Sequence, residues 1–333
     1  MNRVLIIGAG RMGLRHLQGV LQVKEIKEVA ILDLQQSALD AAKEVVGGDS
    51  RVEYYLSDHF IPQSFDICIV ASTALNRKLT CELAERCGCK YLMIEKPLGQ
   101  SYKEVEALVF YLDTLSVTTV VNLNMRMYEP VRKLKQDLLI YPQLQGEKVI
   151  TLNTGTLGIG CNGIHYLDFL FYILDADRAE IVAAEVYDDI IPSGRGAEFC
   201  DFGGWAMIKY YNCEKLLSNV FFSMSSKSTV FGGWEIVAPN GRISIDEIAQ
   251  KRITVLRKED SRMPINRYAA DYLPYNEESF VAPFLGDLTA QWISGLMQGN
   301  NVLPEVKETL KAHQLMFNWL AYSKSFHEIF PIT

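Results

Sequence analysis

The stretch VLIIGAGRMG, residues 4–13, decides the fold of the first part of the chain. A short apolar run typical of a buried strand leads directly into the pattern GxGxxG, and a helical pattern over Met12–Gln22 follows. Such a turn lets the backbone approach a pyrophosphate, and the helix N-terminus offers free N–H groups to it. We predict that the turn binds a dinucleotide through Gly8, Gly10, Arg11, Met12 and Gly13.

Asp33 ends the second predicted strand, 20 residues after Gly13. A carboxylate at this place can accept a hydrogen bond from the ribose 2′-hydroxyl of NAD, and it repels the 2′-phosphate of NADP. The following residues, Leu34-Gln35-Gln36, offer no arginine to bind that phosphate. NAD is therefore the predicted cofactor. A glycine turn in an α/β fold without a nucleotide is the alternative that this pattern leaves open.

The first 125 residues alternate short apolar runs with amphipathic stretches, which is typical of a parallel sheet covered by helices on both faces. We predict a doubly wound α/β domain of the Rossmann type over residues 1–123. Its strands are predicted at Arg3–Ile7, Glu28–Asp33, Val52–Tyr55, Phe65–Ser72, Tyr91–Glu95 and Thr118–Asn122. Its helices are predicted at Met12–Gln22, Ser37–Val46, Asn76–Cys87 and Tyr102–Leu115.

The β-prone runs become longer in the second part of the chain, and we predict an α+β domain with a large, mostly antiparallel sheet over residues 124–333. Asn240-Gly241 predicts a hairpin, since both central positions of its turn favour positive φ. The predicted strands are Lys148–Thr154, Ile181–Tyr187, Trp205–Tyr211, Leu216–Met224, Trp234–Ala238 and Arg242–Ile245. The predicted helices are Gly163–Leu174, Phe284–Gln298 and Pro304–Ser323.

Composition argues against several classes of protein. The net charge of −7 disfavours nucleic acid or an anionic membrane as the main partner, and we interpret two basic runs, residues 132–135 and 251–262, as solvated faces. The chain has no run of about 18 apolar residues and no signal-peptide pattern. Seven cysteines, an odd number without a CxxC pair, predict reduced thiols in a cytoplasmic protein and no metal site.

Two predicted strands end in residues that suit a ligand. Ser72 and Thr73 close the fourth strand, so they lie beside the cofactor or cap the next helix near Asn76. Glu95-Lys96-Pro97 closes the fifth strand. An ammonium held there can hydrogen-bond a substrate hydroxyl and stabilise the alkoxide that develops as hydride leaves. Taken alone, a Glu-Lys-Pro sequence is also compatible with a purely structural role.

Taken together, these motifs resemble the Gfo/Idh/MocA oxidoreductases, the family of glucose–fructose oxidoreductase and inositol dehydrogenase. The resemblance implies a Rossmann domain followed by an open-sheet domain that serves as an oligomer interface, here of a homodimer or homotetramer. It also implies that Lys96 is the catalytic lysine, with Glu95 and Lys96 beside the cofactor. The motifs that carry it are GAGRMG (8–13), AST (71–73), EKPLG (95–99), NMRMYEP (124–130) and GIHYLD (163–168).

The chain departs from the family pattern near the second half of the site. Ala74 replaces the usual proline, and Cys161, followed by Asn162, stands where many members carry an aspartate four residues before the catalytic histidine. Four glycines between residues 155 and 163 indicate a rebuilt substrate pocket. The segments 153–168 and 303–316 are similar to members encoded with bacterial surface-polysaccharide or sialic-acid-like sugar pathways.

His165 begins an apolar helix, where the positive end of the dipole lowers an imidazole pKa and keeps the ring neutral, as a general base requires. Asp168 lies on the same helix face and can orient the ring or bind a substrate hydroxyl. The alternative is that Asn162 caps the helix while His165 satisfies a buried carbonyl. Asn124 and Arg126 enter the cleft after the sixth strand; the arginine suits an anionic substrate group or an inter-domain salt bridge.

These residues predict an NAD-dependent dehydrogenase or reductase. It would move hydride between the nicotinamide and a secondary alcohol or ketone of a sugar, nucleotide sugar or polyol. Lys96 and His165 are the predicted catalytic residues, and Asn124, Arg126, Asn162 and Asp168 the predicted substrate residues. Two alternatives stay open: a non-catalytic NAD and sugar sensor, since the superfamily contains a galactose-regulon co-repressor, and an NAD-dependent glycosidase. Both catalytic groups are present, which favours catalysis, because a sensor needs neither.

Overall fold

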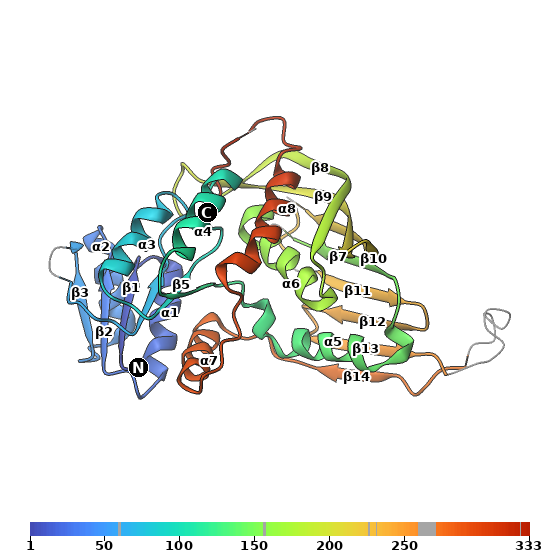
Figure 1. Cartoon of the computed structure of the whole chain (residues 1–333), viewed down its shortest axis with the longest axis horizontal. Coiled ribbons are helices and arrows are strands. Elements are labelled where there is room, and N and C mark those ends of the chain that lie inside the picture. The colour runs from blue at the N-terminus through green and yellow to red at the C-terminus, as the bar shows by residue number, and fades with distance from the viewer. Residues whose placement is uncertain (59–60, 156–157, 226, 231, 259–270, 327) are drawn as a thin grey trace.

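A computed structural model describes residues 1–58, 61–155, 158–225, 227–230, 232–258, 271–326 and 328–333. It contains two sheets that lie side by side (Figure 1). The first has six parallel strands in the order β3-β2-β1-β4-β5-β6, which confirms the predicted doubly wound sheet. These strands are β1 (Arg3–Ile7), β2 (Glu28–Leu32), β3 (Val52–Tyr55), β4 (Ile67–Val70), β5 (Tyr91–Ile94) and β6 (Thr118–Val121).

The helices of this first unit are α1 (Arg11–Gln22), α2 (Gln36–Val46), α3 (Arg77–Arg86) and α4 (Tyr102–Asp113). The strand order reverses between β1 and β4, and the crevice beyond the carboxyl ends of these two strands is where open α/β sheets bind ligands. β4 and β5 are shorter than predicted, so Ser72, Glu95 and Lys96 lie beyond the ends of the strands.

The second sheet has eight strands in the order β14-β13-β12-β11-β7-β10-β9-β8. Neighbours are antiparallel except for β7 and β10, which confirms the mostly antiparallel prediction. The strands are β7 (Lys148–Thr154), β8 (Arg178–Pro192), β9 (Cys200–Asn212), β10 (Lys215–Met224), β11 (Gly233–Ala238), β12 (Gly241–Asp246), β13 (Lys251–Leu256) and β14 (Asn276–Ser279).

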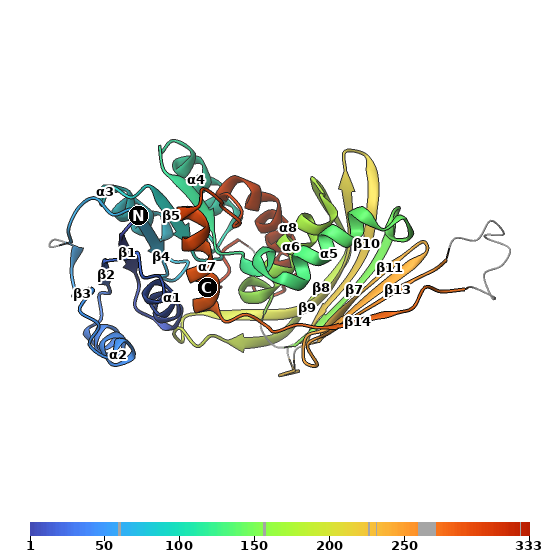
Figure 2. The same ribbon diagram turned by 90° about the horizontal axis from the view of Figure 1, so that it is seen from below.

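Helices cover one face of this sheet (Figure 2). They are α5 (Glu129–Ile140), α6 (Ile164–Leu174) and α8 (Leu310–Leu320), joined to shorter turns at Asn124–Met127, Pro142–Leu144, Gly158–Gly163 and Val306–Thr309. Edge-on aromatic pairs such as Phe169–Trp234 and Phe222–Trp319 fill the space between sheet and helices. The helix α7 (Leu285–Met297) instead returns to the first unit, where Trp292 and Ile293 pack in one core with Val4.

Several details of the second part of the chain differ from the sequence predictions. Gly241 pairs with Ala238, so the hairpin turns through Pro239-Asn240, because proline is suited to the first central position of an ordinary turn. The helix α5 and the strands β13 and β14 were not predicted.

The run 251–262 is not a uniformly solvated face, since the side chain of Arg252 is buried against Asp137. Residues 259–262 of this run lie outside the described part of the chain. No described helix is long and apolar enough to cross a membrane.

Candidate active site at the ends of the parallel strands

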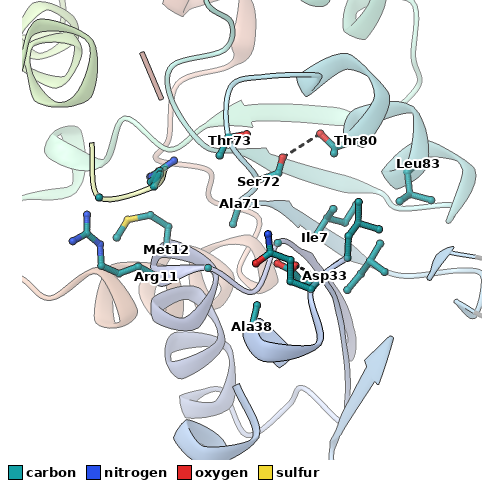
Figure 3. A pocket seen from close by; sticks show the side chains of 17 residues that line it. Ile7, Arg11, Met12, Asp33, Ala38, Ala71, Ser72, Thr73, Thr80 and Leu83 are labelled. Carbon is teal, nitrogen blue, oxygen red and sulfur yellow. Dashed lines mark hydrogen bonds between the residues drawn. The ribbon is translucent and has the colours of Figure 1, made fainter. Parts of the chain in front are cut away.

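Two adjoining cavities open beyond the carboxyl ends of the first sheet's strands. The first, of about 530 Å³, is lined by Gly8, Gly10, Asp33, Ser72 and Thr73 among others (Figure 3). The second, of about 460 Å³, lies towards the second sheet. Arg11, Met12 and Arg195 line both cavities, and Asn124, Asn162, Lys96 and His165 line the second.

The glycine turn has the geometry that the sequence pattern predicts. Gly8 has a φ of +102°, and a Cβ there would lie 2.8 Å from the Ser72 nitrogen. A Cβ on Gly13 would lie 1.8 Å from the Gly8 oxygen, so the protein's own packing requires these two glycines. Around Gly10, by contrast, there is no atom within 4 Å of such a Cβ. The open space beside Gly10 is therefore free for a ligand to approach the backbone.

Asp33 ties the end of β2 to the glycine turn. Its Oδ2 accepts a hydrogen bond from the Ala9 N–H at 2.7 Å, and its Oδ1 accepts one from the Gln35 N–H at 2.9 Å. The carboxylate lines the first cavity, where Figure 3 shows it below Ser72 and Ala71. Leu34 is exposed, and no basic side chain follows Asp33 at this rim of the cavity.

Ser72 and Thr73 do not cap the helix α3. That helix begins after Asn76, which has a left-handed backbone and makes no side-chain capping bond. Ser72 instead donates to the hydroxyl of Thr80 at 3.4 Å, and both Ser72 and Thr73 line the first cavity. Of the two alternatives for these residues, their position is consistent with the one beside a bound ligand.

Glu95 is buried and held by protein groups. Its carboxylate accepts hydrogen bonds from Asn122 at 2.7 Å, from His16 at 2.9 Å and from the Lys96 N–H at 3.2 Å. Burial opposes its ionisation, but the hydrogen bond and charge of His16, together with Lys96, hold the pKa of Glu95 well below its usual value. His16 also contacts Thr289, so this network connects α1, β5 and α7 around an ionised carboxylate.

Lys96 is directed at the turn before α6. Its Nζ donates a hydrogen bond of 2.6 Å to the main-chain oxygen of Cys161 and lies 3.8 Å from the Cys161 Sγ. The same turn donates its Gly160 and Cys161 N–H groups to the carboxylate of Asp201, at 2.9 and 2.6 Å. Burial raises the pKa of Asp201 to about 6, against the effect of these bonds. Sequence reasoning did not single out Asp201.

His165 lines the second cavity with Lys96. Burial, reinforced by the charge of Lys96, lowers the pKa of His165 to about 3, so the ring is neutral at physiological pH. Its Nδ1 has no hydrogen-bond partner among the described residues. The helix α6 begins after Gly163 without a side-chain cap, which removes the capping role considered for Asn162. Asn162 lines the second cavity instead.

Arg126 and Asp168 bind each other rather than line either cavity. The guanidinium donates to both carboxylate oxygens of Asp168, at 2.8 and 2.7 Å, and Arg126 also contacts Glu308 at 3.3 Å. Asp168 is 1% exposed, and burial raises its pKa although Arg126 opposes the shift. The substrate roles predicted for both residues are thus replaced, in this structure, by a buried ion pair between the 124–127 turn and α6.

Several residues that line the second cavity were not predicted from the sequence. Aromatic side chains form part of its wall, and Tyr166 donates to both carboxylate oxygens of Glu247 at 2.8 and 3.0 Å. Burial raises the pKa of Glu247 and that of Tyr128, the latter to about 12. These residues come from separate elements, so no local sequence pattern marks them. The aromatic residues of the wall are Tyr128, Tyr166, Trp234 and Phe280.

The described residues contain no cluster suited to a metal ion.

Comparison with known proteins supports the identity of the first unit. Residues 2–123 match the model of the Gfo/Idh/MocA family, described as an oxidoreductase family with an NAD-binding Rossmann fold. An uncharacterized oxidoreductase of Bacillus subtilis, YrbE, is 30% identical over 134 residues, which is 39% of this chain. The chain thus matches 38% of the length of that relative, so the likeness in sequence is confined to a part of each protein.

Solved structures are similar over nearly the whole chain. A myo-inositol dehydrogenase from Corynebacterium glutamicum has a TM-score of 0.67 at 16% identity, covering 99% of this chain and 98% of its own. The regulator Gal80p from Saccharomyces cerevisiae, in a super-repressor mutant form, has a TM-score of 0.74 at 14% identity, covering 96% of both chains. At these identities the likeness shows the fold, which is shared by an enzyme and a regulator.

Proposed function

Because residues 2–123 belong to the NAD-binding oxidoreductases of the Gfo/Idh/MocA family, we propose that the chain transfers a hydride between the nicotinamide of NAD(H) and a sugar-like substrate. The reacting carbon would be a secondary alcohol or ketone of a sugar, nucleotide sugar or polyol, with a role in surface-polysaccharide metabolism. One observation carries the proposal: Lys96 and His165 line the same cavity, and this cavity adjoins the one beside the glycine turn.

The residues present fit a dinucleotide. Gly10 leaves space for a pyrophosphate to reach the backbone, and Asp33 can accept a hydrogen bond from a ribose 2′-hydroxyl in the first cavity. Asp33 would repel a 2′-phosphate, which favours NAD over NADP. When bound, the nicotinamide supplies the hydride acceptor or donor.

Lys96 and His165 would divide the remaining chemistry. Lys96 has three N–H donors and uses one on the Cys161 oxygen, so another can bind the substrate oxygen and stabilise negative charge on it. During oxidation of an alcohol the hydroxyl proton would pass to His165, whose neutral ring has the protonation state of a base. In the direction of reduction, the protonated ring would return that proton to the alkoxide oxygen.

Glu247 and the aromatic wall would bind the rest of the substrate. Aromatic faces stack against the apolar face of a sugar ring, and a partly buried carboxylate accepts hydrogen bonds from its hydroxyl groups. Asn124 and Asn162 add amide groups to the same cavity. These three kinds of contact suit a polyhydroxylated molecule.

We further propose a homodimer or homotetramer formed through the second sheet. Val149, Phe221 and Val237 lie on adjacent strands of the sheet face opposite the helices, and each is more than two-fifths exposed. Covering such apolar side chains is favourable. Light scattering of the purified protein tests the oligomeric state.

Seven free thiols fit a protein kept in the reducing cytoplasm.

A substrate screen tests the proposed reaction. Sugars, nucleotide sugars and polyols are offered with NAD, and the corresponding ketones with NADH, while absorbance at 340 nm is followed. Substrate-dependent net formation or consumption of NADH supports the dehydrogenase. Product formation without net NADH would indicate a glycosidase that regenerates its cofactor. Binding of NADH and sugar with no turnover would favour the sensor, for which the Gal80p-like fold is the supporting observation.

A further inference from the structure

The connection between β8 and β9 carries an arginine from the second sheet into the dinucleotide cavity. β8 ends at Pro192 and β9 begins at Cys200, and the loop between them reaches the Rossmann unit beside α1 (Figure 2). Gly194 and Arg195 line the first cavity, and Arg195 also lines the second. A Cβ on Gly194 would lie 3.9 Å from the Arg11 Nη1, which places the loop over that side chain.

The loop holds Arg195 in place with its own hydrogen bonds. The Ser193 N–H donates to the Phe199 oxygen at 3.2 Å, and the Arg195 N–H donates to the Ser193 hydroxyl at 3.1 Å. Phe199 is buried, and Gly196 has a φ of +143°, a conformation that favours glycine. The guanidinium itself donates to the hydroxyl of Thr333 at 3.3 Å. The base of the loop is therefore fixed, and the side chain is partly preorganised.

The junction of the two cavities concentrates positive charge. Arg195 and Arg11 form no ion pair with a carboxylate among the described residues. Buried Arg77 lies near Arg195 and donates to main-chain oxygens of Ser72, at 2.8 Å, and Pro97, at 3.2 Å. Burial lowers the pKa of Arg77 to about 10, and the charge of Arg195 acts in the same direction. In a chain with a net charge of −7, this spot fits an anion.

We propose that Arg195 binds the pyrophosphate of the dinucleotide, so that the second domain completes the cofactor site. The inference rests on the proposed function. Asp33 marks the adenosine end of the site, and Lys96 and His165 mark the nicotinamide end. The residues shared by the two cavities lie between these ends, where the pyrophosphate of a dinucleotide spanning both must pass. A planar guanidinium can donate two parallel hydrogen bonds to phosphate oxygens.

Binding of three probes to matched variants tests this role. The probes are NADH, ADP-ribose, which keeps the pyrophosphate but lacks nicotinamide, and adenosine, which lacks both. The variants are Arg195→Ala, Arg195→Lys and the control Arg86→Ala, an exposed arginine on α3 that lines neither cavity. NADH is titrated by its fluorescence, and the other two probes by calorimetry, each at 50 and 300 mM salt.

Arg195→Ala is expected to lower the affinities for NADH and ADP-ribose by about tenfold or more at low salt and by less at high salt. The affinity for adenosine should be unchanged. The affinities of Arg195→Lys should fall between those of wild type and Arg195→Ala, and Arg86→Ala should match wild type. Unchanged ADP-ribose binding by Arg195→Ala overturns the inference, as does an equal loss for all three probes. Failure of the wild-type chain to bind NADH would instead overturn the proposed function itself.

Discussion

Lys96 donates its 2.6 Å hydrogen bond to the main-chain oxygen of Cys161, not to a side-chain carboxylate. Many members of the family carry an aspartate at the position of Cys161. In this chain the main chain of the turn, rather than a carboxylate, contacts the Lys96 ammonium. The Gly160 and Cys161 N–H groups of this turn donate to the carboxylate of Asp201. The loss of an aspartate at position 161 is therefore compatible with a positioned lysine, because the contact does not depend on the identity of that side chain.

Replacing Cys161 and replacing Lys96 should have different effects. Cys161→Ala keeps the main-chain oxygen, so turnover of the substrate found in the 340 nm screen should stay within about threefold of wild type. Lys96→Ala removes the donor to the substrate oxygen and should lower kcat by about 10²–10³. NADH titration should give similar affinities for both variants. Near-normal turnover by Lys96→Ala would rule out the proposed role of the lysine.

Asp33 should determine the choice between the two nicotinamide cofactors. Removing its carboxylate in Asp33→Ala removes the repulsion of a 2′-phosphate, so the ratio of NADPH to NADH affinity should rise by about tenfold, equivalent to about 1.4 kcal/mol. Both affinities are measured by fluorescence titration. Asp113→Ala, a partly exposed acid at the end of α4, serves as the control and should leave the ratio unchanged. An unaltered ratio in Asp33→Ala would contradict the assignment of NAD.

The ion pair between Arg126 and Asp168 should contribute to stability rather than to cofactor binding. Asp168→Asn leaves a largely buried guanidinium with only the exposed Glu308 as its counter-charge and should lower the free energy of unfolding by about 3–5 kcal/mol. Urea denaturation measures the loss. Asp40→Asn, in an exposed pair with Lys43, should leave the free energy of unfolding nearly unchanged, because water screens that pair. If Asp168→Asn unfolded like wild type but raised KM, a substrate role would be restored.

The parts of the fold and site that are encoded locally could be predicted from the sequence. β1, β3 and β7 have the predicted bounds, and the glycine turn faces a cavity with Asp33, because strand burial and turn geometry depend on neighbouring residues. Lys96 and His165, predicted as a pair, line one cavity although they are far apart in the chain. Here the order of motifs, rather than any local pattern, carried the prediction.

Features that depend on distant partners could not be predicted. Arg252 looked like a surface residue because its partner, Asp137, lies on a helix more than a hundred residues earlier. Arg126 and Asp168 each suited a substrate, and only the folded chain shows that they bind each other. Arg195 reaches the first cavity through a long hairpin whose length exceeds the predicted strands on both sides. In each case the sequence indicates the chemistry of the side chain, but it does not indicate which distant residue or cavity that side chain contacts.

His313, on α8, contacts the segment that follows Lys96 and makes the stability of the chain sensitive to acid. Its Nδ1–H donates to the Thr309 oxygen at 2.9 Å, and its Nε2 accepts from the Leu98 N–H at 3.2 Å, so the ring is neutral. Burial lowers the pKa of His313 to about 4, below the ordinary value of 6.5. Between these pH values the unfolded chain takes up a proton that the folded chain does not. The stabilisation is therefore complete above pH 6.5 and is lost as the pH falls towards 4.

His313→Gln should make the free energy of unfolding less dependent on pH in this window. The difference for one buried histidine is on the order of 3 kcal/mol between pH 7 and pH 4. His165, with its pKa of about 3, acts in the same direction, whereas Asp201, with its pKa raised to about 6, gains stability as the pH falls and opposes both. Urea unfolding at pH 8 measures the packing cost of the substitution alone, because both forms of the chain are then neutral at position 313. Parallel wild-type and variant curves from pH 8 to pH 4 would show that His313 does not cause the acid sensitivity.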